Sequence, residues 1–141
     1  MLDKSKYREI NRAPSITMYV VEDAPDILIT VPSKGTKDTV ATAREYVEFL
    51  YAYVAATRQA CSAVVIMDNL LSQDPEARRI YQNIDKARVY AAGLVVASPL
   101  ARALGSFFIG LTRPIAPTKL FNTVDNAVEW LKTMRPQRTE N

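Results

Sequence analysis

Apolar and polar positions near the start of the chain predict two strands. Residues 15–22, SITMYVVE, partly alternate and are rich in β-forming side chains, which is typical of a half-buried strand. A turn cluster follows at residues 23–26, DAPD, and residues 27–31 form a second apolar run. Two such runs joined by a short turn predict a β-hairpin.

Beyond the hairpin, helical and strand patterns alternate. Helices are predicted where apolar residues recur every three or four positions after a capping residue or a proline. The continuous apolar runs between them are typical of strands covered on both faces, as in a parallel sheet. We expect helices at about 38–59, 74–86, 98–111 and 123–135, and strands at 63–67, 89–97 and 118–121. The predicted inner face of the third helix is Leu100, Leu104, Phe107, Phe108 and Leu111.

This order predicts an α/β fold, namely a mixed β-sheet with an N-terminal hairpin followed by β-α-β-α-β-α units. A chain of 141 residues suits one hydrophobic core. We therefore expect residues 1–141 to form a single domain, with loose ends at about 1–12 and 136–141.

Three tyrosines on the first long helix raise the question of a protein interface. Its predicted inner stripe is Val40, Val47, Leu50, Tyr51 and Val54. Tyr53 falls off that stripe, as does Tyr46 in part. Exposed aromatic side chains can mark an interface, which leaves a homodimer open. The alternative is that the rings lie flat against neighbouring side chains.

The charge distribution does not favour a nucleic-acid partner. The net charge is +3, and much of it comes from Lys and Arg at the two ends of the chain. A nucleic-acid surface needs its basic residues clustered on one folded face. We therefore expect no nucleic-acid binding.

The cysteine and histidine counts restrict the chemistry. The chain has one cysteine, Cys61, and no histidine, so the commonest general base and metal ligand are missing. A buried, inert thiol is expected at Cys61, and a reducing, cytoplasmic setting fits a chain that cannot form an internal disulfide. Phosphate-binding glycine motifs are also missing. We expect no metal, no cofactor and no enzymatic activity.

One apolar stretch, residues 89–111, is long enough to suggest a membrane span. Ser98-Pro99 interrupts it, and Arg102 lies near its middle, where a charge is costly in lipid. A buried strand followed by a core helix explains the stretch better, so no membrane span is expected.

The C-terminal half resembles a known family. Residues 95–108, VVASPLARALGSFF, are followed by Arg113-Pro114 and by residues 117–121, PTKLF. Together with Asp68, residues 76–78 (EAR) and residues 127–131 (AVEWL), this pattern is similar to small uncharacterised bacterial proteins grouped with SpoIIAA-like, STAS/SEC14-type domains. The likeness covers roughly residues 60–132. It implies an α/β sheet with packed helices and a regulatory or ligand-binding role without catalysis.

The sequence departs from that family at one functional position. In anti-sigma-factor antagonists of this type, a strand ends in Asp followed directly by a phosphorylatable Ser. Here Asn69 follows Asp68, and the nearest hydroxyl belongs to Ser72. No phosphorylation site is therefore carried over to this chain.

The candidate ligand site is Asp68, Arg78, Ser98 and Arg102. Ser98 would cap a helix whose free amide groups and dipole favour an anion, and Arg102 follows one turn later. Asp68 closes another parallel strand and should open onto the same sheet edge, where ligands usually bind. It could pair with Arg78 or Arg102. The alternative is that these residues serve only as caps and ion pairs.

The leading hypothesis is a non-enzymatic regulatory module that binds a protein partner, with a small anionic or apolar ligand at the strand ends. One alternative is a small enzyme that uses Asp68 as base and Arg102 as anion clamp in a deep pocket. Another is a lipid-binding domain, which requires an apolar cavity under the helix that carries Phe107 and Phe108.

Overall fold

The computed structural model describes residues 2–112 and 116–136. Strands and helices alternate along most of this part of the chain. The strands are β1 (Tyr7–Arg12), β2 (Ile16–Val21), β3 (Ala24–Pro32), β4 (Thr36–Asp38), β5 (Cys61–Ile66), β6 (Leu70–Gln73), β7 (Val89–Val95) and β8 (Thr118–Phe121). The helices are α1 (Val40–Thr57), the short 3₁₀ helix η1 (Met67–Asn69), α2 (Pro75–Gln82), α3 (Pro99–Thr112) and α4 (Val124–Thr133).

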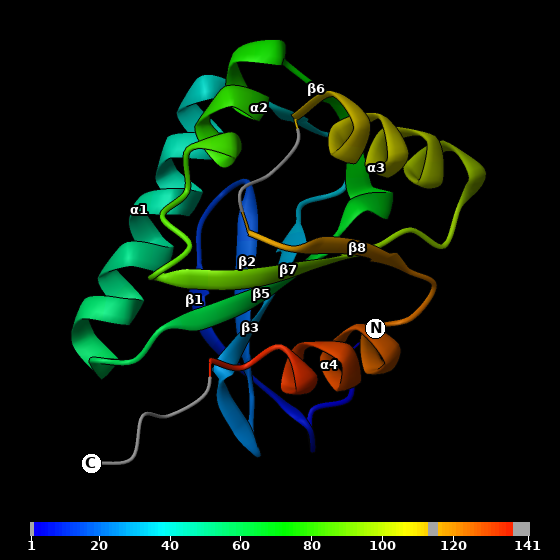
Figure 1. Ribbon diagram of the computed structural model, residues 1–141. Coiled ribbons are helices and arrows are strands. Elements are labelled where there is room, and N and C mark those ends of the chain that lie inside the picture. The colour runs from blue at the N-terminus through cyan, green and yellow to red at the C-terminus, as the bar shows by residue number, and fades with distance from the viewer. Residues whose placement is uncertain (1, 113–115, 137–141) are drawn as a thin grey trace.

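Six strands of the described chain form one sheet in the order β1-β2-β3-β5-β7-β8. The pairs β1–β2 and β2–β3 are antiparallel, whereas β3–β5, β5–β7 and β7–β8 are parallel. Helices α1, α2 and α3 lie on one side of the sheet and α4 lies on the other (Figure 1). This is the mixed α/β architecture predicted from the sequence, and that prediction is confirmed.

The N-terminal hairpin is confirmed, but the first strand was missed. β2 and β3 pair in the register Tyr19↔Ile29. The expectation of a loose segment over residues 1–12 is wrong for residues 7–12, which form β1 along β2. β1 lies at the edge of the sheet with one face in water, so most of its side chains are polar, and only Tyr7 is fully buried. The expected loose end at 136–141 falls, beyond residue 136, outside the described residues.

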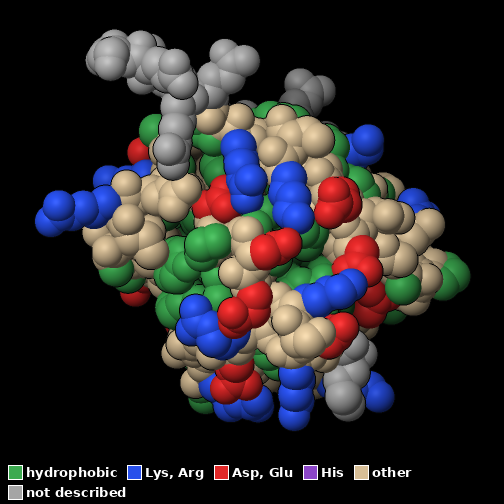
Figure 2. All heavy atoms as spheres, turned by 90° about the horizontal axis from the view of Figure 1, so that it is seen from below, with side chains coloured by type: hydrophobic (Ala, Val, Ile, Leu, Met, Phe, Trp, Pro, Cys, Tyr) green, Lys and Arg blue, Asp and Glu red, His purple; other side chains and the backbone are tan. Residues whose placement is uncertain are grey.

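The side of the molecule that carries α4 mixes charges of both signs. Lys and Arg side chains lie among Asp and Glu side chains there (Figure 2). Lys132 Nζ lies 3.7 Å from Asp23 and 3.5 Å from Glu129, and Lys6 Nζ lies 3.6 Å from Asp125. These side chains border a polar hollow of about 390 Å³. This face lacks the concentrated positive charge of a nucleic-acid surface.

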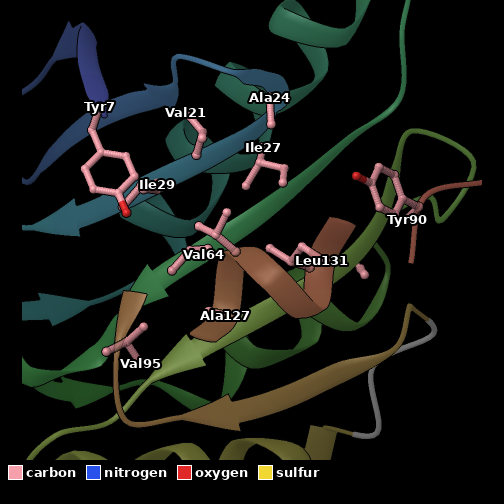
Figure 3. Close-up of a cluster of buried hydrophobic side chains, with 12 residues drawn as sticks. Tyr7, Val21, Ala24, Ile27, Ile29, Val64, Tyr90, Val95, Ala127 and Leu131 are labelled. Carbon is pink, nitrogen blue, oxygen red and sulfur yellow. The ribbon is translucent and has the colours of Figure 1, made fainter. Parts of the chain in front are cut away.

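The hydrophobic core has a layer on each side of the sheet. Between the sheet and α4, the buried side chains include Ile29, Val64 and Leu131 (Figure 3). Between the sheet and α1, they include Leu28 and Leu50. Because the central strands are covered on both faces, both sets of alternating side chains must be apolar, which explains the continuous apolar runs.

Two helices face the sheet differently from the prediction. Leu100 was expected inside, yet it is 63% exposed, and α3 instead turns Ala101 and Gly105 inward. A Cβ added at Gly105 would lie 2.9 Å from Leu120 Cδ2, so the small residue lets α3 approach the sheet closely. The side chains of Leu104, Phe107, Phe108 and Leu111 lie outside the described residues. In α1 the buried residues are Ala43, Tyr46 and Leu50.

The three tyrosines of α1 all contact neighbours within the chain. Tyr46 is buried, which corrects its expected position partly off the inner face. The Tyr53 hydroxyl donates to the carbonyl oxygen of Pro25 at 2.7 Å. The Tyr51 hydroxyl accepts from the Asp85 amide at 2.9 Å. The structure therefore removes the exposed aromatic patch that favoured a homodimer.

Candidate functional site

The four residues of the predicted ligand site do not form one cluster. Asp68 lies in η1, directly after β5, and Ser98 follows β7. Asp68 Oδ1 accepts from the Ser98 amide at 2.8 Å, and Oδ2 accepts from the Ala97 amide at 3.2 Å. The Asp68 side chain thus connects the end of β5 to the loop after β7. The two are close because β5 and β7 are parallel and end at the same edge of the sheet.

The start of α3 is occupied by acceptors of the chain itself. Ser98 Oγ accepts from the Ala101 amide at 3.1 Å, so Ser98 caps the helix as predicted. The amides of Ala97, Ser98 and Ala101 are the donors that would otherwise bind an anion. An anion at this point would have to displace the Asp68 carboxylate.

The two arginines of the predicted set have separate contacts. Arg102 Nη2 donates to Asn122 Oδ1, which lies just after β8. Arg78 Nη1 donates to the carbonyl oxygen of Gln73 at 3.4 Å, which places Arg78 beside β6. The structure therefore joins Asp68 to Ser98, Arg102 to Asn122, and Arg78 to the segment that precedes α2.

The sequence did not predict the apolar cavity that the structure contains. It has a volume of about 100 Å³ and lies between the sheet and the helices α1 and α2. Much of its wall is apolar and includes Leu50 of α1, Met67 of η1, and Val89 and Leu94 of β7. None of Asp68, Arg78, Ser98 and Arg102 lines this cavity or the polar hollow beside α4.

Part of the cavity wall is a network of hydrogen bonds to Asp38. Asp38 is only 6% exposed. Its carboxylate accepts from the Tyr81 hydroxyl at 2.8 and 2.9 Å, from Thr42 Oγ1 at 2.7 Å and from Gln73 Nε2 at 3.0 Å. Burial raises the pKa of Tyr81, and the Asp38 charge raises it further, so this hydroxyl stays protonated and donates.

The Asp38 network joins elements that the sequence analysis treated separately. Asp38 was expected to cap α1, but Thr39 is the N-cap, and its side chain accepts from the Thr42 amide. Asp38 instead ends β4, which pairs in parallel with β6. No sequence signal links Asp38 to Tyr81, which lies on another helix.

A second buried carboxylate lies on the opposite side of the sheet. Asp26, 6% exposed, accepts two hydrogen bonds from Arg135 at 2.9 and 3.0 Å and one from the Tyr90 hydroxyl at 2.8 Å. Burial raises the pKa of Asp26, but the bonds from Arg135 and Tyr90 outweigh burial and leave it below its ordinary value. The group is thus a paired anion that connects β3 to the segment after α4.

Cys61 is fully buried at the start of β5, and its prediction as a buried thiol is confirmed. Burial raises the pKa of Cys61 to about 12, so very little thiolate exists near neutral pH. Within the described residues, no three Cys, Asp or Glu side chains gather where they could hold a metal ion. No helix in that same part of the chain has the length and apolar character needed to cross a membrane.

The architecture is that of the SpoIIAA-like fold. An uncharacterised protein of the DUF3478 family from Shewanella loihica PV-4 has this fold and matches with a TM-score of 0.54 at 11% identity, over 89% of this chain and 91% of that one. An anti-sigma factor antagonist from Mycobacterium paratuberculosis matches with a TM-score of 0.52 at 21% identity, over 86% of this chain and 99% of that one. The predicted resemblance to SpoIIAA-like domains is confirmed at the level of the fold.

The chain belongs to the family described as Domain of unknown function (DUF7793), which matches residues 19–135. The comparison with curated proteins yields no match.

Proposed function

We propose that this chain is a regulatory module without catalytic activity that binds a protein partner at the carboxyl end of its parallel strands. The observation that carries the proposal is the exposure of two leucines on segments that follow β5 and β7. Leu71 in β6 is 57% exposed, and Leu100 at the start of α3 is 63% exposed. Large apolar side chains that gather on one face are a feature of partner-binding surfaces, and these two leucines follow parallel strands that end at the same edge of the sheet.

The loops beside these leucines support a recognition role. The Asp68 carboxylate is engaged by two backbone amides, and Arg102 is bonded to Asn122. A general base or an anion clamp needs groups that can reach a substrate. Here the same groups hold loops in place, as a binding surface of fixed shape requires.

The shared fold also supports the proposal. The similar protein from Mycobacterium paratuberculosis is named an anti-sigma factor antagonist, a name that describes action on another protein. With Asn69 in place of a serine after Asp68, we propose that binding here is not switched by phosphorylation at this position.

The test compares partner binding by matched variants. The wild-type chain is used to capture proteins from its native lysate, and each candidate is then purified and its affinity measured. Leu71→Ser with Leu100→Ser should weaken binding at least tenfold. The control, Ala52→Ser with Ala55→Ser on the exposed face of α1, should bind like the wild type. Equal binding by both double variants would overturn the proposal.

A small anionic ligand at Asp68, Arg78, Ser98 and Arg102 is a second proposal. It is supported by the position of Ser98 at the start of α3, and it requires the anion to displace the Asp68 carboxylate from the two amides. Calorimetric titration with inorganic phosphate tests it, because Arg102→Ala should then lose binding. Equal phosphate binding by Arg102→Ala and the wild type would refute it. The enzyme alternative requires Asp68 to leave the two amides that now hold it.

A homodimer, a cytoplasmic setting and lipid binding are also predicted. A homodimer is tested by light scattering of the purified chain. A cytoplasmic setting is supported by the single buried Cys61. Lipid binding under α3 depends on Phe107 and Phe108, whose side chains lie outside the described residues.

A further inference from the structure

We infer that the cavity beneath α1 and α2 binds a small, uncharged and largely hydrocarbon molecule. The cavity lies beside the proposed partner-binding end, because Leu70 and Gln73 of β6 line it, but the inference does not depend on partner binding. The cavity is the space of about 100 Å³ bounded by the sheet, α1 and α2.

The space exists because two small residues lie opposite each other in the centre of the sheet. Ala63 of β5 and Ala92 of β7 are register partners, and both line the cavity. The next residues on the same face are Val65 and Leu94, whose larger side chains fill more of the space between the sheet and the helices. Helix α1 cannot close the gap, because Tyr46 holds its distance from β3 through a 2.9 Å hydrogen bond donated by Thr30. The void is therefore built into the packing of the central strands.

The polar side chains at the cavity satisfy one another. Asp38 accepts from Tyr81, Thr42 and Gln73, and the Tyr46 hydroxyl accepts from Thr30. The wall that remains is mostly carbon, so a ligand gains by burying hydrocarbon there. Apolar pockets take apolar molecules, and a cavity of about 150 Å³ holds the six carbons of benzene, so a space of about 100 Å³ fits on the order of four carbons.

The buried carboxylate selects against anions. Asp38 lines the cavity and is only 6% exposed, so its carboxylate is poorly hydrated. A ligand carboxylate placed in the same space would meet a like charge in a poorly solvated site, which is unfavourable. A neutral alcohol with the same carbon chain would not. The cavity should therefore separate two molecules that differ only in their end group.

The experiment uses 1-butanol and butanoate as probes of the full chain at neutral pH. Calorimetric titration should show 1-butanol binding at least ten times more tightly than butanoate. Butanol should also raise the melting temperature of the wild type, since it binds only the folded state. Ala92→Leu fills the space and should abolish both effects. Ala41→Leu, which adds the same atoms on the exposed face of α1, should leave them unchanged.

Two outcomes would overturn the inference. One is an equal response to butanol by the wild type and Ala92→Leu, which would mean that butanol acts elsewhere or only as a solvent. The other is binding of butanoate as tight as that of butanol. If Ala92→Leu does not fold, the smaller change Ala63→Val replaces it. Asp38→Asn gives an independent readout, because it should narrow the difference between the two probes.

Discussion

Arg135→Leu should destabilise the protein more than any other single removal of a surface cation from the region of α4. Arg135 donates two hydrogen bonds to Asp26, and Asp26 is only 6% exposed. The substitution keeps an apolar stem against the core but leaves a buried carboxylate without its cation. Tyr90 would be the remaining described donor to Asp26.

The size of the effect follows from how deeply the Asp26 and Arg135 side chains are each buried. Breaking a fully buried ion pair costs about 3–5 kcal/mol. The Arg135 side chain is 42% exposed, so water can reach the carboxylate once the guanidinium is gone. The retained Tyr90 bond reduces the loss further, and we expect about 2 kcal/mol. For a urea slope of about 2 kcal/mol per molar, the midpoint should fall by about 1 M.

The loss should depend on pH in a defined direction. The pKa of Asp26 is lowered in the folded state, so the pair stabilises the protein above the unfolded pKa of about 3.9. That contribution is lost as the pH falls through the folded pKa. The difference between wild type and Arg135→Leu should therefore be full at about pH 7 and shrink toward about pH 3.

The assay is urea unfolding followed by the fluorescence of Trp130, the one tryptophan in the sequence, which lies in α4 with its ring 5.5 Å from that of Phe121. Lys132→Leu is the matched control. It removes one positive charge three residues before Arg135, in the last turn of α4, but its partners Asp23 and Glu129 are exposed, so less than about 1 kcal/mol should be lost. Equal losses in the two variants, or a loss independent of pH, would refute the reasoning.

Three further predictions concern single positions. Asp68→Ala should cost about 1–2 kcal/mol in denaturant unfolding, because two backbone amides lose their acceptor; an unchanged midpoint contradicts this. Gly93→Val should lower the melting temperature by an amount corresponding to about 1–3 kcal/mol, since even a first Cβ there would lie 3.1 Å from Ala127 Cβ in α4; a neutral effect contradicts the packing. Cys61, with its pKa raised to about 12, should react with a thiol reagent only after denaturant is added, and rapid labelling of the native protein would count against its burial.

The sequence predicted the elements whose burial produces a recognisable pattern of apolar residues. β5 and β7 are covered on both faces and show continuous apolar runs, and α2 and α3 begin at prolines after a polar residue. β1 was missed because an edge strand with a wet face carries charged side chains such as Arg8 and Glu9. β4 has three residues, too few for any periodicity.

The site was harder to predict than the fold for a physical reason. The approach of Asp68 to Ser98 follows from the shared carboxyl edge of parallel strands, so topology alone suggested it. The cavity depends instead on which side chains are small at matched positions of two strands. Ala63 and Ala92 become partners only through the register of β5 and β7, and their alignment cannot be read from either segment separately.

The contacts of α4 also bear on how the chain acquires its fold during synthesis. The Tyr7 hydroxyl donates to Asp125 of α4 at 2.7 Å, and Arg135 just after α4 binds Asp26, so this helix and the segment that follows it hold β1 and β3. Until α4 has emerged from the ribosome, nothing covers the apolar side chains of β3 and β5 that it buries. This half of the core is therefore completed only after residues 124–133 have been synthesised, and until then its apolar side chains are open to aggregation.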